Sequence, residues 1–335
     1  MSQTGVGVAI AASGSAAPVA ELTNDQLSEV VETSDDWIRT RTGIRSRRLA
    51  GSEETLSRLA AQAAQAAIAA ANLDPNEIDL ILLATSTPDD LFGSAAHIQA
   101  QIGATRAVAF DLTAACSGFI FGLVTAAQFI RTGVYRNVLL IGADVLSRWV
   151  DWSDRTTCVL FGDGAGAVVL QATTGRDRLL GFELCSDGRL HHTLNLAYQG
   201  EARAIAPHLT VTAGGYQPIS MNGREIYRFA VAKVPEVISK ALFRAGLAAT
   251  DLDWLLLHQA NQRIMDAVAD RLQLPREKAL SNLAKYGNTS AASIPLALDE
   301  AVRTGQVKAG DRIAAAGFGA GLTWGAVVFE WGAVG

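Results

Sequence analysis

The stretch Asp111-Leu-Thr-Ala-Ala-Cys-Ser-Gly-Phe119 joins an apolar, strand-like run that begins at Ala107 to a helical pattern that ends at Arg131. Its small residues allow the chain to turn sharply, as in strand-turn-helix nucleophile elbows. Cys116 lies at the bend, where the free N–H groups and the dipole of the predicted helix favour a thiolate. The position indicates a nucleophile. A buried structural cysteine is the alternative, because free Cys is among the most buried residue types.

The composition describes a globular chain with enough apolar material for a large core. Of 335 residues, 49% are hydrophobic and 18% are charged, and this length favours about two domains. The net charge of −5 argues against nucleic acid as the main partner. No apolar run approaches the ~18 residues of a membrane span. The three cysteines, Cys116, Cys158 and Cys185, form no metal-ligand or disulfide pattern, which fits a reducing cytoplasm.

Apolar runs alternate with helical patterns along the chain. The predicted strands are 6–11, 79–85, 107–112, 137–143 and 161–170, and the predicted helices are 23–26, 52–72, 95–103 and 118–131. Continuous apolar runs of this length are typical of parallel strands buried on both faces. The alternation of strand and helix predicts an α/β fold.

The second half of the chain repeats the first. The stretch 71–83 aligns without gaps with 245–257, an offset of 174 residues, and each stretch is a helix end, a turn and a strand. Arg131-Thr-Gly133 recurs as Arg303-Thr-Gly305, an offset of 172. Two matches in the same order favour duplication. We therefore expect two similar units, 1–175 with the nucleophile and 176–335.

The repeat also predicts where the chemistry lies. Adding 172 to the position of Cys116 gives Asn288, so the two are expected to be pseudo-symmetry mates. His258 follows the strand 254–257, at the position equivalent to Ala84. Ligands bind outside the carboxyl ends of strands in open α/β sheets. Cys116, His258 and Asn288 are therefore expected to converge on one site.

Four motifs carry a family resemblance: Ala115-Cys-Ser-Gly-Phe119, His258-Gln-Ala-Asn261, Gly287-Asn-Thr-Ser290 and Gly317-Phe-Gly-Ala-Gly321. With them, nearly the whole chain resembles β-ketoacyl-acyl carrier protein synthase III, the family of initiating condensing enzymes of fatty acid synthesis. The resemblance implies the thiolase fold, in which two duplicated βαβαβαββ halves form five αβαβα layers, and it implies a homodimer.

The resemblance also implies a mechanism with two substrates, an acyl-coenzyme A primer and malonyl-acyl carrier protein. Cys116 takes the acyl group from the primer. His258 and Asn288 then donate hydrogen bonds to the malonyl thioester oxygen, which stabilise the enolate formed as carbon dioxide leaves. The backbone N–H groups of Cys116 and Ala320 form the oxyanion hole, although the family usually has glycine at the second position. No metal or other cofactor is expected.

The remaining site residues are implied by the resemblance alone. The coenzyme A positions are Thr33, Trp37, Arg41, Arg155 and Asn261, with adenine expected between the Trp37 ring and the Arg155 guanidinium. The residues of 33–45 by themselves favour a capped helix with Trp37 packed on the core, and the resemblance reverses that preference. Arg224 stands where the family often has an asparagine.

Two further expectations concern partners. Phe92 matches a position that reaches across the dimer to close the partner's acyl pocket, and its bulk favours a short primer such as acetyl. The acidic carrier protein is expected to dock on basic positions, which are Arg228, Arg263 and Arg271; a solvated helix face is their alternative.

Two other functions fit the same motifs. A relative on this fold can make a specialised, polyketide-type metabolite or transfer the acyl group to an alcohol or amine, and only the acyl pocket would distinguish it. A non-catalytic binding module on the thiolase fold is the other alternative, and the intact Cys-His-Asn trio argues against it.

Overall fold

Two five-stranded sheets form the frame of residues 6–332, the part of the chain that this computed structural model describes. The first sheet has the order β1 (Gly7–Ala16), β7 (Gly164–Thr173), β6 (Asn137–Asp144), β4 (Leu80–Ala84) and β5 (Val108–Leu112). The second has the order β8 (Leu179–Ser186), β16 (Thr323–Glu330), β15 (Arg312–Gly319), β13 (Trp254–Leu257) and β14 (Ala279–Leu280). In each sheet the inner strand β4 or β13 is parallel to both neighbours, and the remaining pairs are antiparallel.

The helices complete two matching halves. Between its strands the first half carries α3 (Leu56–Ala70), α4 (Ala95–Ile102) and α5 (Gly118–Arg131), and the second carries α6 (Gly223–Ala245), α7 (Gln262–Arg271) and α9 (Ser293–Arg303). Each half therefore runs βαβαβαββ, as predicted. The predicted boundary near residue 175 falls between β7 and β8 and stays a prediction as a domain boundary.

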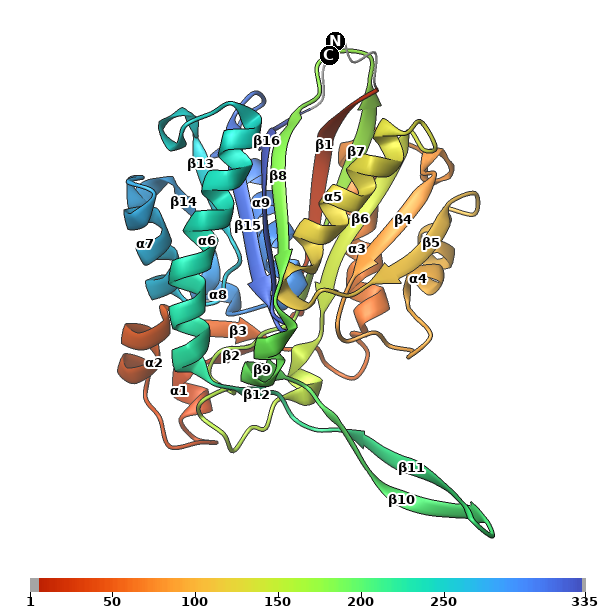
Figure 1. Cartoon of the computed structure of the whole chain (residues 1–335), viewed down its shortest axis with the longest axis vertical. Helices are drawn as coiled ribbons and strands as arrows, with labels where there is room; N and C mark the ends of the chain where they lie inside the picture. Colours follow the sequence, from red (N-terminus) through yellow and green to blue (C-terminus); the bar gives the residue numbers. More distant parts are fainter. Residues whose placement is uncertain (1–5, 333–335) are drawn as a thin grey trace.

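The helices lie between the two sheets and outside them (Figure 1), and the hydrophobic clusters show which helix packs on which face. Apolar side chains of α5 and α9 pack together between the two sheets. Those of α3 and α4 cover the outer face of the first sheet, and those of α6 and α7 cover the outer face of the second. The result is the five-layer αβαβα arrangement of the thiolase fold.

The strand and helix boundaries follow from local chemistry. The strand β4 is buried over its whole length, as its unbroken apolar run predicts. The helix α3 begins later than expected, because the Thr55 side chain accepts a hydrogen bond from the Arg58 amide and caps it. The strand β1 runs on past its predicted end through Gly14, where an added Cβ would meet the Ala63 oxygen at 2.4 Å. Glycine thus allows α3 to lie directly on β1.

Smaller elements extend from this frame. They are β2 (Glu21–Thr23), α1 (Asn24–Leu27), α2 (Asp35–Thr42), β3 (Ser46–Arg48), β9 (Leu194–Asn195), β10 (Tyr198–Ala206), β11 (Leu209–Tyr216), β12 (Ser220–Met221) and α8 (Leu283–Tyr286). The hairpin β10–β11 projects away from the body and is exposed along its length (Figure 1). Among the described residues, no helix is both long enough and apolar enough to cross a bilayer.

Candidate active site

Cys116 lies in a short 3-10 turn, Ala115–Ser117, which we call the first elbow and which leads directly into α5. Ala115 has a φ of 47°, so the chain passes through the left-handed region as it turns from strand to helix. The Ser117 hydroxyl donates to the Ala114 oxygen at 2.7 Å. The cysteine therefore precedes the helix, as the sequence predicts, with 8% of its surface exposed.

The second half contains a matching turn, Ser290–Ala292, which we call the second elbow and which leads into α9. Ser290 has a φ of 51° and so corresponds to Ala115. Ala291 is therefore the mate of Cys116, and the prediction that Asn288 is its mate is wrong. The reason is that α9 has 11 residues and α5 has 14. The offset of 172 holds at the helix ends and becomes 175 at the helix starts.

One cavity of about 520 Å³ is nevertheless lined by Cys116, His258 and Asn288 together. It extends to Arg224 on α6 and to Arg263 on α7, both of which are exposed. The structure thus places the three residues predicted to converge on one cavity that reaches the surface.

His258 is held in a dry setting. It follows β13, its backbone N–H donates to the Ala316 oxygen at 2.8 Å, and 2% of its surface is exposed. The ring meets Phe318 edge to face, with ring centroids 5.4 Å apart, and Nδ1 is buried and has no hydrogen-bond partner among the described residues. Burial lowers the pKa of His258 to about 3. The imidazole is therefore neutral and keeps one N–H to donate.

Asn288 is fixed by its backbone and by its side-chain oxygen. Its N–H donates to the Leu160 oxygen at 2.8 Å, and its own carbonyl accepts from the Gly162 N–H at 3.0 Å. Oδ1 accepts from the Ser290 amide at 2.9 Å. Among residues 6–332 the amide nitrogen donates to no other group, so it is the part of the side chain left to donate to a ligand in the cavity.

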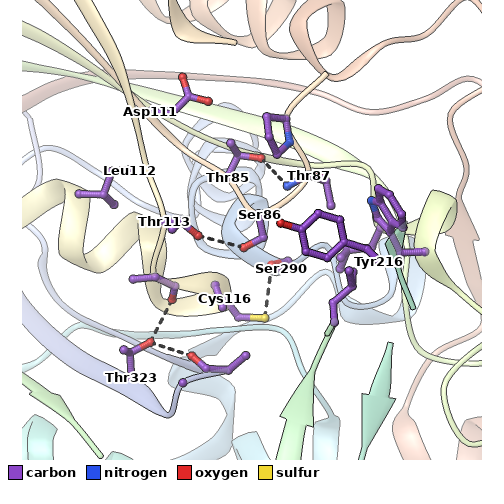
Figure 2. Close-up of a pocket in the computed structure, with 18 of the residues that line it drawn as sticks. Thr85, Ser86, Thr87, Asp111, Leu112, Thr113, Cys116, Tyr216, Ser290 and Thr323 are labelled. Atoms are coloured by element: carbon purple, nitrogen blue, oxygen red, sulfur yellow. Dashed lines mark hydrogen bonds between the residues drawn. The ribbon is translucent and has the colours of Figure 1, made fainter. Parts of the chain in front are cut away.

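The nucleophile is a thiol at rest. The Ser290 hydroxyl donates to the Cys116 sulfur at 3.3 Å (Figure 2). Burial raises the pKa of Cys116 to about 12; the Ser290 hydrogen bond opposes this shift, and the charge of Asp144 adds to it. In the free chain, desolvation thus opposes the thiolate that the helix dipole was expected to favour.

The two backbone amides expected to form an oxyanion hole are both available. Within the described chain, neither the Cys116 amide nor the Ala320 amide donates to another group. The end of β15 approaches the first elbow so closely that a Cβ on Gly319 would lie 2.6 Å from the Cys116 nitrogen. Glycine at 319 thus permits this approach, and Ala320 follows it at the edge of the second cavity described next.

Cys116 also lines a larger cavity of about 1220 Å³. Its walls include Phe110 of β5 and a Trp149–Tyr216 pair whose ring centroids are 6.1 Å apart. Phe92 borders this cavity in its own chain, and its side chain is fully exposed. That Phe92 closes the pocket of a partner chain stays a prediction.

The adenine slot expected beside Trp37 is closed. The guanidinium of Arg41 lies 4.6 Å from the Trp37 ring centroid, and that of Arg155 lies 5.3 Å from it. A ring stacked between two groups needs them about 7 Å apart, because each contact takes about 3.5 Å. Arg155 also donates to the Glu32 oxygen at 3.0 Å. Adenine can enter between Trp37 and Arg155 only if Arg155 swings outward.

The other coenzyme A positions differ in how free they are. Asn261 caps α7: its Oδ1 accepts from the Arg263 amide at 2.9 Å, and its amide nitrogen donates to the Arg41 oxygen at 3.0 Å. It still lines the smaller cavity. The Thr33 hydroxyl is sealed and has no partner among the described residues. Asn261 therefore has a structural role, because both the oxygen and the nitrogen of its side-chain amide already make hydrogen bonds within the chain.

The basic positions expected to receive the carrier protein lie on α6 and α7. Arg228 and Arg263 are exposed, and the guanidinium of Arg263 lies 5.8 Å from the Tyr227 ring centroid. Arg271, also exposed, donates to the Val231 oxygen at 3.1 Å and so ties α7 to α6. Arg263 borders the smaller cavity, which places it best of the three for a partner at the mouth of that cavity.

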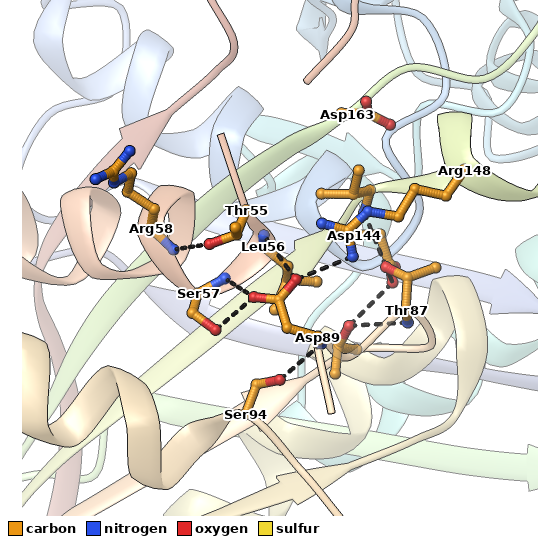
Figure 3. A network of polar contacts seen from close by, with 12 residues as sticks. Thr55, Leu56, Ser57, Arg58, Thr87, Asp89, Ser94, Asp144, Arg148 and Asp163 are labelled. Carbon is orange, nitrogen blue, oxygen red and sulfur yellow. Dashed lines mark hydrogen bonds and ion pairs between the residues drawn. The ribbon is translucent and has the colours of Figure 1, made fainter. Parts of the chain in front are cut away.

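Two residues of the site escaped the sequence analysis. Ser290 stands in a quoted motif but was given no role; aligning the two elbows at an offset of 175 would have drawn attention to it. Asp144 is fully buried at the end of β6. It accepts hydrogen bonds from Thr87 at 3.0 Å (Figure 3) and from the Ala291 amide at 3.1 Å. A carboxylate that ends an apolar strand was the available signal.

Comparison with known proteins gives consistent matches. The family model described as 3-Oxoacyl-[acyl-carrier-protein (ACP)] synthase III matches residues 110–188, and the model described as the C terminal of that synthase matches residues 242–331. The Beta-ketoacyl-[acyl-carrier-protein] synthase III of Trichormus variabilis is 69% identical over 327 residues, which cover 98% of this chain and 99% of that one.

Solved structures agree with these matches. The 3-oxoacyl-[acyl-carrier-protein] synthase III of Aquifex aeolicus VF5 has a TM-score of 0.89 at 46% identity, covering 97% of this chain and 100% of that one. The priming beta-ketosynthase of the R1128 polyketide pathway has a TM-score of 0.90 at 34% identity, covering 98% of this chain and 97% of that one. The fold is thus shared more widely than the sequence.

Proposed function

Because the chain belongs to the 3-oxoacyl-[acyl-carrier-protein] synthase III family, we propose that it joins a short acyl-coenzyme A primer to malonyl-acyl carrier protein and so initiates fatty acid synthesis. It is an acyltransferase of the condensing type, working through an acyl-cysteine. The observation that carries the proposal is the position of Cys116, which lines both cavities, with His258 and Asn288 beside it in the smaller one.

In the first half-reaction, the primer enters through the smaller cavity and the Cys116 sulfur attacks its thioester carbonyl. The developing oxyanion lies against the free amides of Cys116 and Ala320. Coenzyme A leaves with the proton of the thiol, and the acyl group stays on sulfur. The larger cavity then holds the acyl chain.

In the second half-reaction, malonyl-acyl carrier protein enters through the same smaller cavity. The N–H of neutral His258 and the free amide nitrogen of Asn288 donate to the malonyl thioester oxygen. Carbon dioxide leaves, and the enolate carbon attacks the acyl carbonyl on Cys116. The cysteine departs as the β-ketoacyl product forms on the carrier. The reaction so written uses no metal or redox cofactor.

Two pathways could use this reaction, fatty acid synthesis and polyketide synthesis. A polyketide priming synthase shares the fold at 34% identity, whereas the synthase of Trichormus variabilis is 69% identical. The higher identity favours fatty acid initiation, and the bulk of Phe92 favours acetyl as the primer. The three free cysteines support a reducing cytoplasm as the compartment.

A homodimer is supported by an unprotected sheet edge. The outermost strand β5 exposes 49% of Val108 and 39% of Phe110. Next to it, Leu91 and Phe92 expose 77% and 100% of their surfaces. Natural proteins cover or charge such edges. Pairing of two copies along β5 would bury the edge and close the larger cavity.

The test is a panel of acyl-coenzyme A primers, followed by malonyl-acyl carrier protein, with the products read by mass spectrometry. We expect an acyl mass on Cys116 and then a β-ketoacyl carrier, with acetyl among the preferred primers. Peptide mapping serves as the control. An acyl group on Cys158 or Cys185, or one that survives Cys116→Ser, would overturn the assignment.

A further inference from the structure

We infer that Ser290 is a further catalytic residue, whose hydroxyl stabilises the Cys116 sulfur as a thiolate when it attacks the primer and when it leaves the product. The inference goes one step beyond the proposed function and rests on it for the identity of the reaction. Its ground is the 3.3 Å contact from the Ser290 oxygen to the Cys116 sulfur.

This contact joins two segments 174 residues apart in the sequence. The hydroxyl comes from the second elbow, and the sulfur belongs to the first elbow (Figure 2). The pseudo-symmetry therefore sets the two turns face to face. The first elbow carries the nucleophile Cys116. The second elbow has Ala291 at the equivalent position, and its Ser290 donates a hydrogen bond to the nucleophile.

The hydroxyl is aimed by its surroundings. Ser290 is 2% exposed, and its backbone amide is tied to the Oδ1 atom of Asn288 at 2.9 Å. The next amide, of Ala291, donates to Asp144 at 3.1 Å. The other oxygen of Asp144 already accepts from the Thr85 and Thr87 hydroxyls at 3.1 and 3.0 Å. Asp144 is thus a positioning residue that fixes the second elbow through the Ala291 amide, and Figure 3 shows its contact with Thr87.

The chemistry requires such a donor. Burial disfavours the charged form of Cys116, and the Asp144 carboxylate adds a repulsive charge. A hydrogen bond to an ionised acceptor is about twice as strong as one to a neutral acceptor. The Ser290 hydroxyl thus contributes most when the sulfur is negative. By contrast, Asn288 donates toward the malonyl oxygen, so the two residues act on different substrates.

The variant Ser290→Ala isolates the hydroxyl. It keeps the backbone amide that donates to the Oδ1 atom of Asn288. Alanine also tolerates the left-handed backbone at this position, because Ala115 has the same conformation in the first elbow. Ser293→Ala is the matched control, because Ser293 is 1% exposed in the same segment and its hydroxyl contacts Thr289 at 3.2 Å instead of the sulfur. The parent protein and both variants carry Cys185→Ser, which removes the half-buried thiol, while Cys158 is fully buried.

The first measurement is the rate of exchange with dithiodipyridine between about pH 7 and pH 9, which needs no acyl substrate. Losing one hydrogen bond to a charged acceptor raises a thiol pKa by about one to two units. A more basic thiolate is also more nucleophilic, with a Brønsted slope of about 0.4–0.5. We therefore expect Ser290→Ala to exchange roughly three- to ten-fold more slowly at each pH, and Ser293→Ala to match the parent.

Other titratable groups could change the pH profile, so they are kept unchanged. Asp144 acts on the thiol through its charge, and His258 lines the smaller cavity with it. The others that border the two cavities are Asp111, His191, Tyr216, Arg224, Tyr227 and Arg263. Every variant retains these groups. Ser290→Ala also acts on Asp144, because the Ser290 side chain lowers the pKa of that carboxyl, whereas Ser293→Ala leaves this contact in place.

The second measurement separates the steps of catalysis. Acylation by acetyl-coenzyme A should fall in Ser290→Ala by a similar factor, while release of carbon dioxide from malonyl-acyl carrier protein without primer should keep the parent rate. Exchange at the parent rate in Ser290→Ala, or equal slowing in Ser293→Ala, would overturn the inference. If Ser290→Ala slowed the exchange but the parent protein accepted no acyl group, the proposed function would be overturned and the inference would stand.

Discussion

Replacing Asn288 with alanine is expected to separate the two half-reactions. The Oδ1 atom of Asn288 is occupied by the Ser290 amide at 2.9 Å, which leaves the amide nitrogen to donate to the malonyl thioester oxygen. Loss of one preorganised donor costs about 10²–10³ in rate where negative charge develops. Decarboxylation and condensation should therefore fall by roughly that factor in Asn288→Ala.

The effect on acylation should be smaller, and the structure sets its size. Asn288→Ala also removes the acceptor that holds Ser290, whose hydroxyl contacts the Cys116 sulfur. A neutral hydrogen bond contributes about 0.5–1.5 kcal/mol, which corresponds to roughly a two- to thirteen-fold change in rate. Acylation of Cys116 should therefore slow by about thirteen-fold at most.

The assay is rapid-quench acylation with labelled acetyl-coenzyme A beside release of carbon dioxide from malonyl-acyl carrier protein. His258→Ala is the comparator, and it should impair both steps because the imidazole lies in the cavity with the sulfur and with Asn288. Ser293→Ala controls for packing beside the second elbow. If Asn288→Ala abolished acylation yet released carbon dioxide at the normal rate, the role assigned to Asn288 in the second half-reaction would be wrong.

Three further outcomes are expected. Phe92→Ala should extend the range of primers accepted, because each added methylene that finds apolar room is worth about 0.8 kcal/mol; an unchanged primer-length profile would mean that another group closes the pocket. Arg263→Glu should raise the KM for malonyl-acyl carrier protein about ten-fold, while acylation of Cys116 stays within about two-fold. Added salt should weaken the carrier step of the parent protein as well; equal loss in both steps of the variant would indicate misfolding. His258 should contribute a fall of about 1.4 kcal/mol per pH unit in the free energy of unfolding as the pH drops below 6.5, because the unfolded chain binds a proton that the buried imidazole, with its pKa of about 3, does not. Chemical denaturation of His258→Gln should lack that contribution, and an identical pH slope in both proteins would contradict it.

The fold was open to prediction because its inner strands, such as β4 and β6, are buried on both faces. The strand Leu80–Ala84 is sealed in the structure, and such strands are recognisable as continuous apolar runs in the sequence. The internal repeat placed His258 correctly at the end of β13, because strands equivalent by the repeat end on the same edge of their sheets. These features depend on periodicity, which the sequence displays directly.

The elbow register could not be predicted in the same way. Between the two halves, the helix after the elbow differs by three residues, which is close to one helical turn. Shortening a helix by about one turn leaves its apolar residues on nearly the same face. The hydrophobic pattern of the sequence therefore does not show that residues are missing. Asn288 was therefore paired with Cys116, whereas the structure pairs Ala291 with it.

The pKa of Cys116 and the positions of exposed side chains also could not be predicted from the sequence. The helix dipole acting on Cys116 can be inferred from local order, but the burial that raises its pKa depends on segments far along the chain. Likewise, the distance from Arg155 to Trp37 depends on the rotamers of partly exposed side chains. In both cases tertiary surroundings oppose a local signal, and the adenine position beside Trp37 stays a prediction.

The place of β1 in the first sheet has a consequence for synthesis of the chain on the ribosome. Among the described strands, β1 has β7 as its one sheet neighbour, and ~150 residues separate Ala16 from Gly164. At about 5–20 residues per second, β1 waits roughly 7–30 s for its partner to be translated. During that interval Val8 and Ile10, which end up buried, belong to an unpaired apolar strand. A nascent chain arrested before Gly164 should therefore bind chaperones and resist folding, whereas one released after Thr173 can close the sheet.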